Sequence, residues 1–326
     1  MILSIFLYVF LQSRILGTTE NTSEERCLNL SGEESLIYID GEYYPRSEAK
    51  ISVFDHGFLY GDGVFEGIRS YNGIVFKLKE HIDRLYYSAR AIMLNIPMTK
   101  EEMTEAVLET LRRNNLKDAY VRLIVTRGKG DLGIDPRKCP KPSVIIIAVP
   151  LLQLYDEKKR ESGMSMIVSW VRRDPVDATT HEIKSLNYLN SILAKIEANN
   201  VGADEAIILD SNGFISEATA ENIFIVKGDM IITPPSTSGP LPGITACVIK
   251  EIAQKLGYQV IEKGITVAEL YGADEAFVTG TAAEVMPIRE VNKRQIGEGK
   301  MGPVTRKILE KFREFIKDPK NGVPIW

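Results

Sequence analysis

The stretch His181-Glu-Ile-Lys-Ser-Leu-Asn-Tyr-Leu-Asn190 places a lysine, Lys184, shortly before a predicted helix. The helix is expected from Tyr188 to Asn199, because apolar side chains recur there at helical spacing. These side chains form one stripe: Leu189, Ile192, Leu193 and Ile196. Ser185 and Asn187 are candidate caps for its first turn. A capped start would fix the backbone at Lys184 and let its amine point inward.

Three later segments supply a carboxylate and two turns rich in small residues. They are Ser216-Glu217-Ala-Thr-Ala-Glu-Asn222, Pro242-Gly-Ile-Thr245 and Gly280-Thr-Ala-Ala-Glu284. A lysine amine can form an imine, and a carboxylate can hold a proton on a ring nitrogen. Turns before helices offer free backbone N–H groups to a phosphate. In this order, the four segments predict a site for pyridoxal phosphate.

Glu217 is the carboxylate that we expect to meet the ring nitrogen. In the run Phe214-Ile-Ser-Glu217 it shares a strand face with Ile215, and an inward-facing carboxylate needs a donor partner. Two alternatives stay open: Glu217 lies exposed at a strand end, or Glu221 takes its place. Tyr188, one helical turn after Lys184, is close enough to contact the 3′-oxygen of the same ligand.

Two predicted strands in the first half of the chain can line a substrate cavity. Strand alternation places Tyr120 and Arg122 on one face of one strand. It places Phe65, Gly67 and Arg69 on one face of the other. An arginine can recognise a carboxylate through two parallel hydrogen bonds, whereas the aromatic rings supply apolar wall. The alternative is that both arginines are paired at the surface.

Two further side chains in this half are candidates. Tyr60, at the start of a glycine-rich segment, adds to the apolar wall. Arg84 lies on a helix expected from Glu80 to Leu94. From there it either reaches a phosphate or pairs with Asp83.

The composition excludes several classes of function. The chain has 326 residues, 44% of them apolar and 26% charged, as in ordinary globular proteins. A net charge of −4 and a pI near 5.7 give no reason to expect nucleic acid or a membrane as a partner. The cysteines (Cys27, Cys139, Cys247) and histidines (His56, His81, His181) lack the spacing of a disulfide framework or a metal site. We therefore expect no metal, and a location in the reducing cytoplasm.

The N-terminus is expected to lie outside the folded domains. Residues 1–35 begin with an apolar run, Met1 to Leu11, which is too short to span a membrane. An export signal would carry a basic segment before this run, whereas Arg14 follows it. The segment is interpreted as an extension, with an export signal or a start codon assigned too far upstream as the alternatives.

The rest of the chain predicts two domains. Residues 36–153 form a small α/β domain, with a hairpin at Asp40-Gly41 and a helix capped by Thr99 and Glu102. A charged segment, Asp156 to Glu161, marks the change to a larger domain, residues 154–326. Strands and helices mix without strict βαβ alternation, which favours an α+β or barrel-like fold over a doubly wound sheet.

These motifs closely resemble the class IV (fold type IV) pyridoxal-phosphate aminotransferases, and among them the branched-chain amino acid aminotransferases. The resemblance runs from about Ile37 to Lys311. Besides the segments already quoted, it rests on Tyr60-Gly-Asp-Gly-Val-Phe-Glu-Gly-Ile-Arg69, His81-Ile-Asp-Arg-Leu85 and Ala119-Tyr-Val-Arg122. The fold that it implies is a small α/β domain beside a larger pseudo-barrel domain, with the site between them.

The resemblance also implies roles for individual residues. Lys184 would be the catalytic Schiff-base lysine and proton carrier. The cofactor contacts would be Arg84, Lys184, Tyr188, Glu217, Ile244, Thr245 and Thr281. The substrate contacts would be Tyr60, Phe65, Gly67, Arg69, Tyr120, Arg122, Ala282 and Ala283.

The implied reaction is a reversible ping-pong transfer of an amino group between L-leucine, L-isoleucine or L-valine and 2-oxoglutarate. Its partners would be these amino acids and 2-oxo acids, in a homodimer or a dimer-based hexamer. A D-amino acid aminotransferase and an aminodeoxychorismate lyase are alternatives, because both share the lysine, the glutamate and the phosphate turns. A non-catalytic binding protein of the same fold is a third, which the intact Lys184 and Glu217 disfavour.

Overall fold

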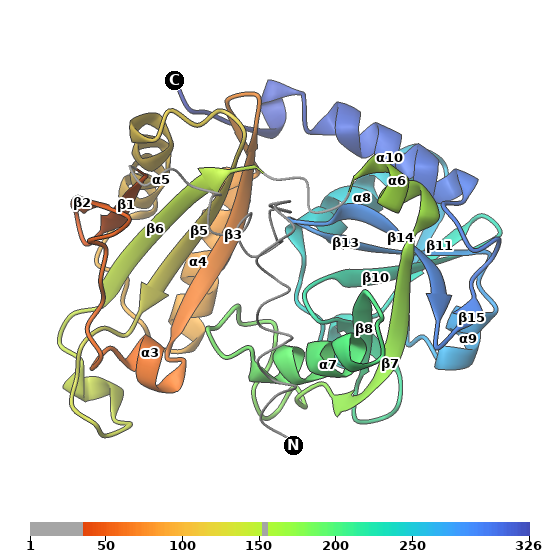
Figure 1. The fold of residues 1–326 in the computed structure, drawn as a ribbon, viewed down its shortest axis with the longest axis horizontal. Coiled ribbons are helices and arrows are strands. Elements are labelled where there is room, and N and C mark those ends of the chain that lie inside the picture. Colours follow the sequence, from red (N-terminus) through yellow and green to blue (C-terminus); the bar gives the residue numbers. More distant parts are fainter. Residues whose placement is uncertain (1–34, 152–155) are drawn as a thin grey trace, which may run out of the picture.

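The computed structural model describes residues 35–151 and 156–326. Figure 1 shows two lobes side by side, the first coloured red to yellow-green and the second green to blue, each built on one β-sheet. The expectation for residues 1–35 falls outside the described residues, apart from Ser35. Among the described helices, none has the length and apolar character needed to cross a membrane.

The first lobe is an antiparallel sheet, and two of its three described helices, α4 and α5, pack on it. The strand order is β16-β4-β3-β5-β6-β1-β2. The strands are β1 (Leu36–Ile39), β2 (Glu42–Pro45), β3 (Gly63–Tyr71), β4 (Ile74–Phe76), β5 (Ala119–Thr126), β6 (Ser143–Pro150) and β16 (Gly322–Pro324). The helices are α3 (His56–Tyr60), α4 (Leu78–Ala91) and α5 (Lys100–Arg113), with a 3-10 turn at Pro136–Lys138. The apolar faces of α4 and α5 close one core over β3, β5 and β6.

Local sequence signals account for much of this lobe. The β1–β2 hairpin turns at Asp40 and Gly41, both with positive φ, as a two-residue hairpin requires. Thr99 and Glu102 form both hydrogen bonds of the predicted capping box at α5. Helix α4 ends three residues earlier than expected, because the chain turns away at Met93, where φ is 53°.

The second lobe is a mixed sheet that curls into a half-barrel. The strand order is β12-β11-β10-β13-β14-β7-β8-β9, with β15 paired to β14. The strands are β7 (Met164–Arg172), β8 (Glu205–Leu209), β9 (Ile215–Ala218), β10 (Asn222–Lys227), β11 (Met230–Thr233), β12 (Gln259–Glu262), β13 (Glu275–Gly280), β14 (Glu284–Val291) and β15 (Arg294–Gln295). The edge strand β9 returns beside β10, and an apolar core fills the curl. The expected barrel-like larger domain is confirmed, and with it the two-part α/β architecture.

Five helices surround this half-barrel. They are α6 (Glu157–Ser162), α7 (Leu189–Asn200), α8 (Ile244–Lys255), α9 (Val267–Tyr271) and α10 (Pro303–Phe315), with 3-10 turns at Ser236–Ser238 and Pro319–Asn321. Helices α8 and α10 pack together over one side of the sheet and enclose a second apolar core.

Helix α7 lies where the sequence predicts it, but two of its details differ. Its N-cap is Tyr188, whose side chain makes no capping hydrogen bond, so the expected caps Ser185 and Asn187 are wrong. The apolar stripe of Leu189, Ile192, Leu193 and Ile196 would ordinarily face a core. Here these side chains are 45% to 59% exposed, because the small residues Ser191, Ala194 and Ala198 pack against the sheet instead.

The two lobes are joined by main-chain pairing along β3. Strand β4 pairs with β3 only at Ser70 and Tyr71, which leaves the edge of β3 open near Gly63 to Phe65. Residues 184–186 occupy this edge: Phe65 N donates to Lys184 O at 3.0 Å, and Leu186 N donates to Gly63 O at 2.9 Å. An isolated bridge between Val64 and Ser185 completes the pairing.

A buried carboxylate forms a second joint. Glu284 begins β14 with a φ of 59°, and its Oε1 accepts from Arg69 Nη1 of the first lobe at 3.0 Å. Its Oε2 accepts from Arg160 Nη2 of α6 at 3.1 Å, and Tyr71 also donates to Oε1. One carboxylate thus pairs with two arginines, one from each lobe, that are each 4% exposed.

The predicted division between residues 153 and 154 lies outside the described residues and stays a prediction. The structure adds one feature to it: β16, near the C-terminus, pairs with β4 and so belongs to the first sheet.

We expect Glu284→Gln to lower the free energy of unfolding by about 3–5 kcal/mol, because it leaves two buried arginines without their carboxylate. Denaturant unfolding measures this. Glu298→Gln is the control, since Glu298 is 80% exposed and pairs only with an exposed lysine. A loss for Glu284→Gln no larger than for this control would contradict a structural role for the joint.

Candidate active site

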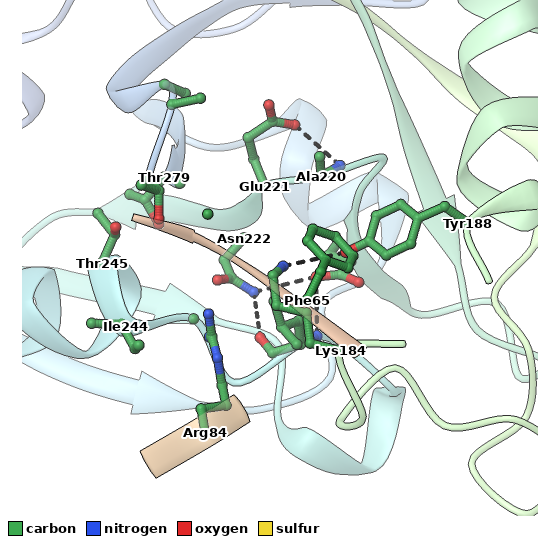
Figure 2. Close-up of a pocket in the computed structure, with 18 of the residues that line it drawn as sticks. Phe65, Arg84, Lys184, Tyr188, Ala220, Glu221, Asn222, Ile244, Thr245 and Thr279 are labelled. Carbon is green, nitrogen blue, oxygen red and sulfur yellow. Dashed lines mark hydrogen bonds between the residues drawn. The ribbon is translucent and has the colours of Figure 1, made fainter. Parts of the chain in front are cut away.

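A cavity of about 460 Å³ lies between the two lobes, and most of the predicted site residues line it. Figure 2 shows Lys184, Phe65 and Tyr188 grouped at one side, with Arg84, Ile244 and Thr245 at the other. The predicted residues on its wall are Phe65, Gly67, Arg84, Tyr120, Arg122, Lys184, Tyr188, Glu217, Ile244, Thr245, Thr281, Ala282 and Ala283. Residues far apart in sequence therefore meet around one space.

Two predicted substrate residues do not reach this cavity. Tyr60, at the end of α3, is 43% exposed, and its hydroxyl donates to Leu132 O at 2.5 Å. Arg69 is buried against Glu284 and Tyr71. Strand alternation placed Arg69 on the same face as Phe65 and Gly67, but four residues along β3 carry it past the end of the cavity.

Lys184 is held tightly by its backbone. Its carbonyl accepts from Phe65 N, and its N–H donates to Ser88 Oγ at 3.1 Å. Its Nζ donates to the Tyr188 hydroxyl at 3.3 Å and lies 4.7 Å from the centre of the Phe65 ring. Burial lowers the pKa of Lys184 to about 8, with Arg84 adding to the effect and Glu66 opposing it. A buried amine with this pKa can carry a proton near neutral pH.

Arg84 is positioned by an anion that the sequence reasoning missed. Glu66, fully buried on β3, accepts from Arg84 Nε at 2.7 Å and from Nη2 at 2.8 Å. His81 Nδ1 lies 2.7 Å from the same carboxylate. Burial would raise the pKa of Glu66, but Arg84 and His81 outweigh it and lower the pKa to about 2. The sequence does contain a signal for this pair: Glu66 lies among apolar residues of a predicted strand, and a buried glutamate needs a cationic partner.

The start of α8 forms a cup suited to an anion. Its N-cap, Gly243, provides no side-chain cap, so the first-turn N–H groups of Ile244 and Thr245 face outward at the positive end of the helix. Arg84 Nη1 donates to Pro242 O at 2.8 Å, which brings the guanidinium beside this cup. A side chain at position 243 would overlap Asn222 Oδ1, so only glycine fits this approach.

Glu217 lies buried on β9, as the strand alternation predicted, and donors surround its carboxylate. Arg173 Nη2 is 3.1 Å from Oε1, while Leu241 N and Asn222 Nδ2 donate to Oε2 at 3.1 and 3.4 Å. Burial raises the pKa of Glu217, and Arg173 opposes that rise. Sequence reasoning missed Arg173, because nothing in its local pattern distinguishes it from the exposed Arg172 beside it.

The rival carboxylate, Glu221, also lines the cavity but has different surroundings. Its Oε2 accepts a long hydrogen bond, 3.3 Å, from Ala220 N. Burial and the neighbouring Glu205 raise the pKa of Glu221 to about 7. Glu217, which an arginine faces, is therefore the better partner for a positively charged ring N–H.

The wall from the first lobe combines aromatic and cationic groups. Arg122 Nη2 donates to the Tyr120 hydroxyl at 3.0 Å, and the Arg122 guanidinium lies 4.6 Å from the centre of the Phe65 ring. The Tyr120 hydroxyl can take this position because residue 67 is glycine; a side chain there would overlap the hydroxyl. The cavity thus has an apolar surface with an arginine at its edge.

The fold is that of an amino-group transferase, as comparison with known proteins shows. Residues 63–291 match the family described as amino-transferase class IV. The chain belongs to this family and is a transaminase.

The similar proteins within this family carry names that specify branched-chain amino acids. A Methanocaldococcus jannaschii protein, provisionally named a branched-chain-amino-acid aminotransferase, is 54% identical over 279 residues, covering 86% of this chain and 96% of the relative. The branched-chain-amino-acid aminotransferase of Escherichia coli K12 is 40% identical over 281 residues, covering 85% and 91%. The solved branched-chain aminotransferase of Thermoproteus uzoniensis with norvaline superposes with a TM-score of 0.84 at 40% identity, covering 89% and 99%.

The family uses pyridoxal 5′-phosphate, and the residues present here fit that group. The cup at α8 and Arg84 suit its phosphate, Glu217 suits a ring N–H, and the amine of Lys184 suits its aldehyde. Thr279 Oγ1, on the cavity wall, is buried without a partner in the described protein and could bond to a ligand there.

We expect Lys184→Met to raise the thermal midpoint of the cofactor-free protein at pH 7 by about 2–4 °C, the shift that roughly 1 kcal/mol produces. The pKa of Lys184 falls from 10.5 to about 8 on folding, so the buried cation costs stability below pH 8. That cost fades as the pH rises from about 8 to 10.5, and the gain should fade with it. Lys79→Met is the control, because Lys79 is 84% exposed. An equal gain at pH 7 and pH 11 would show that the charge is not its cause.

Proposed function

We propose that this protein transfers amino groups reversibly between L-leucine, L-isoleucine or L-valine and 2-oxoglutarate, with pyridoxal phosphate as cofactor. The observation that carries the proposal is the cavity itself: Lys184 and Glu217 line it together with Phe65, Tyr120 and Arg122. The family and the names of the relatives support the branched-chain substrates. They give no support to the D-amino acid aminotransferase or the lyase.

The cofactor is proposed to be held by Arg84, Tyr188, Glu217, Ile244, Thr245 and Thr281, and covalently by Lys184. When bound, pyridoxal phosphate supplies an electron sink for the Cα of an amino acid. Glu217 keeps a proton on the ring nitrogen, and Tyr188 bonds to the 3′-oxygen. Once the substrate's amine has displaced it from the cofactor, the freed Lys184 Nζ would take the proton from Cα and deliver it to the cofactor carbon that bears the amino group, a task that its pKa of about 8 favours.

Substrate recognition is proposed to use both lobes. Tyr120 and the backbone of Thr281 and Ala282 take the α-carboxylate, which the small side chains of that turn leave accessible. Phe65, Gly67 and Ala283 contact a branched apolar side chain. Arg122, at the edge of this surface, binds the distal carboxylate of glutamate when the second substrate occupies the same space.

We further propose a cytoplasmic homodimer, either alone or assembled into a hexamer. The exposed stripe of α7 supports an assembly, because large apolar patches usually mark contact sites. Ile192 belongs both to that stripe and to the cavity wall, so a second copy there would also close the cavity. Tyr60 and Arg69 do not reach the cavity of a single chain, so we propose no substrate contact for either residue there.

The first test of the function is the visible absorption spectrum of the cofactor-loaded protein. We expect its band to bleach on addition of L-leucine, because the amino group passes to the cofactor, and to stay unchanged with D-alanine. Bleaching by D-alanine alone would instead favour the D-amino acid branch. A loaded sample without any band would contradict the enzyme proposal.

We expect Arg122→Ala to lower kcat/KM for 2-oxoglutarate by about 10- to 100-fold, the value of one or two charge-assisted hydrogen bonds. The half-reaction with L-leucine should change much less, since leucine has no distal carboxylate. Single-turnover kinetics with each substrate separate the two. Equal losses would mean that Arg122 does not recognise the distal carboxylate.

A further inference from the structure

The side chain of Arg173 is buried deep in the second lobe, directly behind Glu217. It follows the end of β7, is 1% exposed, and its N–H donates to Leu209 O at 2.8 Å. A buried guanidinium requires several acceptors and a compensating anion. The acceptors come from two further segments of the chain, the start of α7 and β9.

These acceptors fix the orientation of the guanidinium. Arg173 Nη1 donates to Asn190 Oδ1 at 2.9 Å and to Ser191 Oγ at 3.2 Å, both at the start of α7. Arg173 Nη2 donates to Ala218 O at 3.1 Å and lies 3.1 Å from Glu217 Oε1. Glu217 is the carboxylate that pairs with Arg173 among the described ion pairs.

We propose that Arg173 is a positioning residue that keeps Glu217 ionised and correctly oriented, so that the cofactor's ring nitrogen, and not Glu217, holds the shared proton. This inference rests on the proposed function, since it concerns the cofactor bound there. Arg173 acts through Glu217 and touches neither cofactor nor substrate.

Charge explains why the arginine is needed. Burial favours the neutral form of Glu217, and a neutral carboxyl facing a neutral ring nitrogen is the alternative to an ion pair. The positive charge of Arg173 has two opposing effects: it stabilises the Glu217 carboxylate, and it disfavours a proton on the cofactor ring. The first effect is larger, because Arg173 contacts Glu217 directly whereas the ring lies farther away. The other charged or titratable groups that influence Glu217 are Lys184, Arg84, Tyr188 and Glu221.

The neighbouring histidine cannot replace this cation. His181 lies 3.3 Å from Arg173 Nη1 and 3.4 Å from Asp174 Oδ2. Burial and the charge of Arg173 lower the pKa of His181 to about 4, so it is neutral at working pH. Arg173 therefore supplies a positive charge that is constant across the physiological range.

The test is the ¹⁵N chemical shift of bound pyridoxal phosphate labelled at its ring nitrogen, which reports directly whether that nitrogen is protonated. In the unaltered protein we expect the protonated value at pH 7.5. Arg173→Gln should move the shift toward the unprotonated value and weaken cofactor binding about tenfold or more, as a change of one pKa unit corresponds to a tenfold change in equilibrium. Arg172→Gln, at the exposed neighbouring position, should leave both unchanged.

Two further variants separate positioning from folding. Arg173→Lys keeps the charge, so the ring nitrogen should stay protonated even where stability falls. The double variant Arg173→Gln with Glu217→Gln leaves no unpaired buried charge. Compared with Glu217→Gln alone, it should change the ¹⁵N shift and the cofactor Kd by less than about twofold, because coupled residues do not act additively.

The outcomes distinguish the two claims. If the unaltered protein binds no pyridoxal phosphate, the proposed function fails. If it binds the cofactor and Arg173→Gln leaves the shift and the Kd unchanged, only the inference fails. It also fails if Arg173→Gln has the same effect with and without the Glu217 carboxylate, or if Arg173→Lys deprotonates the ring nitrogen.

Discussion

The open edge of β3 is the constraint on which the site depends. Because β4 covers only the far end of that strand, Gly63 to Phe65 pair with residues 184–186 of the second lobe. This pairing joins the lobes and fixes the backbone of Lys184 at the same time. A flexible lysine side chain loses much rotational freedom when its amine is held in one place. Because the main chain of Lys184 is anchored to a sheet, only its side chain remains to be ordered. Contacts of its amine with the Tyr188 hydroxyl and the Phe65 ring restrict that side chain.

Buried carboxylates paired with arginines are the second theme of this molecule. Glu66 holds Arg84 beside the anion cup, Glu217 faces Arg173 behind the cavity, and Glu284 joins arginines of both lobes. Such pairs contribute little net stability compared with apolar packing, but breaking one leaves a buried charge uncompensated. Their value here is geometric: each fixes the direction of a charged group that would otherwise turn toward water.

Local sequence signals predicted the elements well. The hairpin at Asp40-Gly41, the capping box at Thr99 and the strand from Ala119 to Thr126 formed as expected, because each depends on neighbouring residues. The ordered motifs also predicted the cavity wall, since thirteen predicted residues line it. Arg69 was assigned to that wall because alternation gives the face of a strand but not how far along it a cavity extends.

The sequence by itself therefore determined the family, the cofactor that the family uses, and most of the predicted residues that line the cavity. Each follows from residue types in a fixed order. The tertiary structure alone decided which charges meet. Arg173 and Glu217 pair across distant segments of the chain, and so do Arg69 and Glu284. Even Glu66 and Arg84 are 18 residues apart and lie on different elements. It also turned the apolar stripe of α7 outward, because small residues on the opposite side fit closer to the sheet. Long-range pairing depends on how the sheets curl and pack, and that is a property of the whole chain and not of any segment.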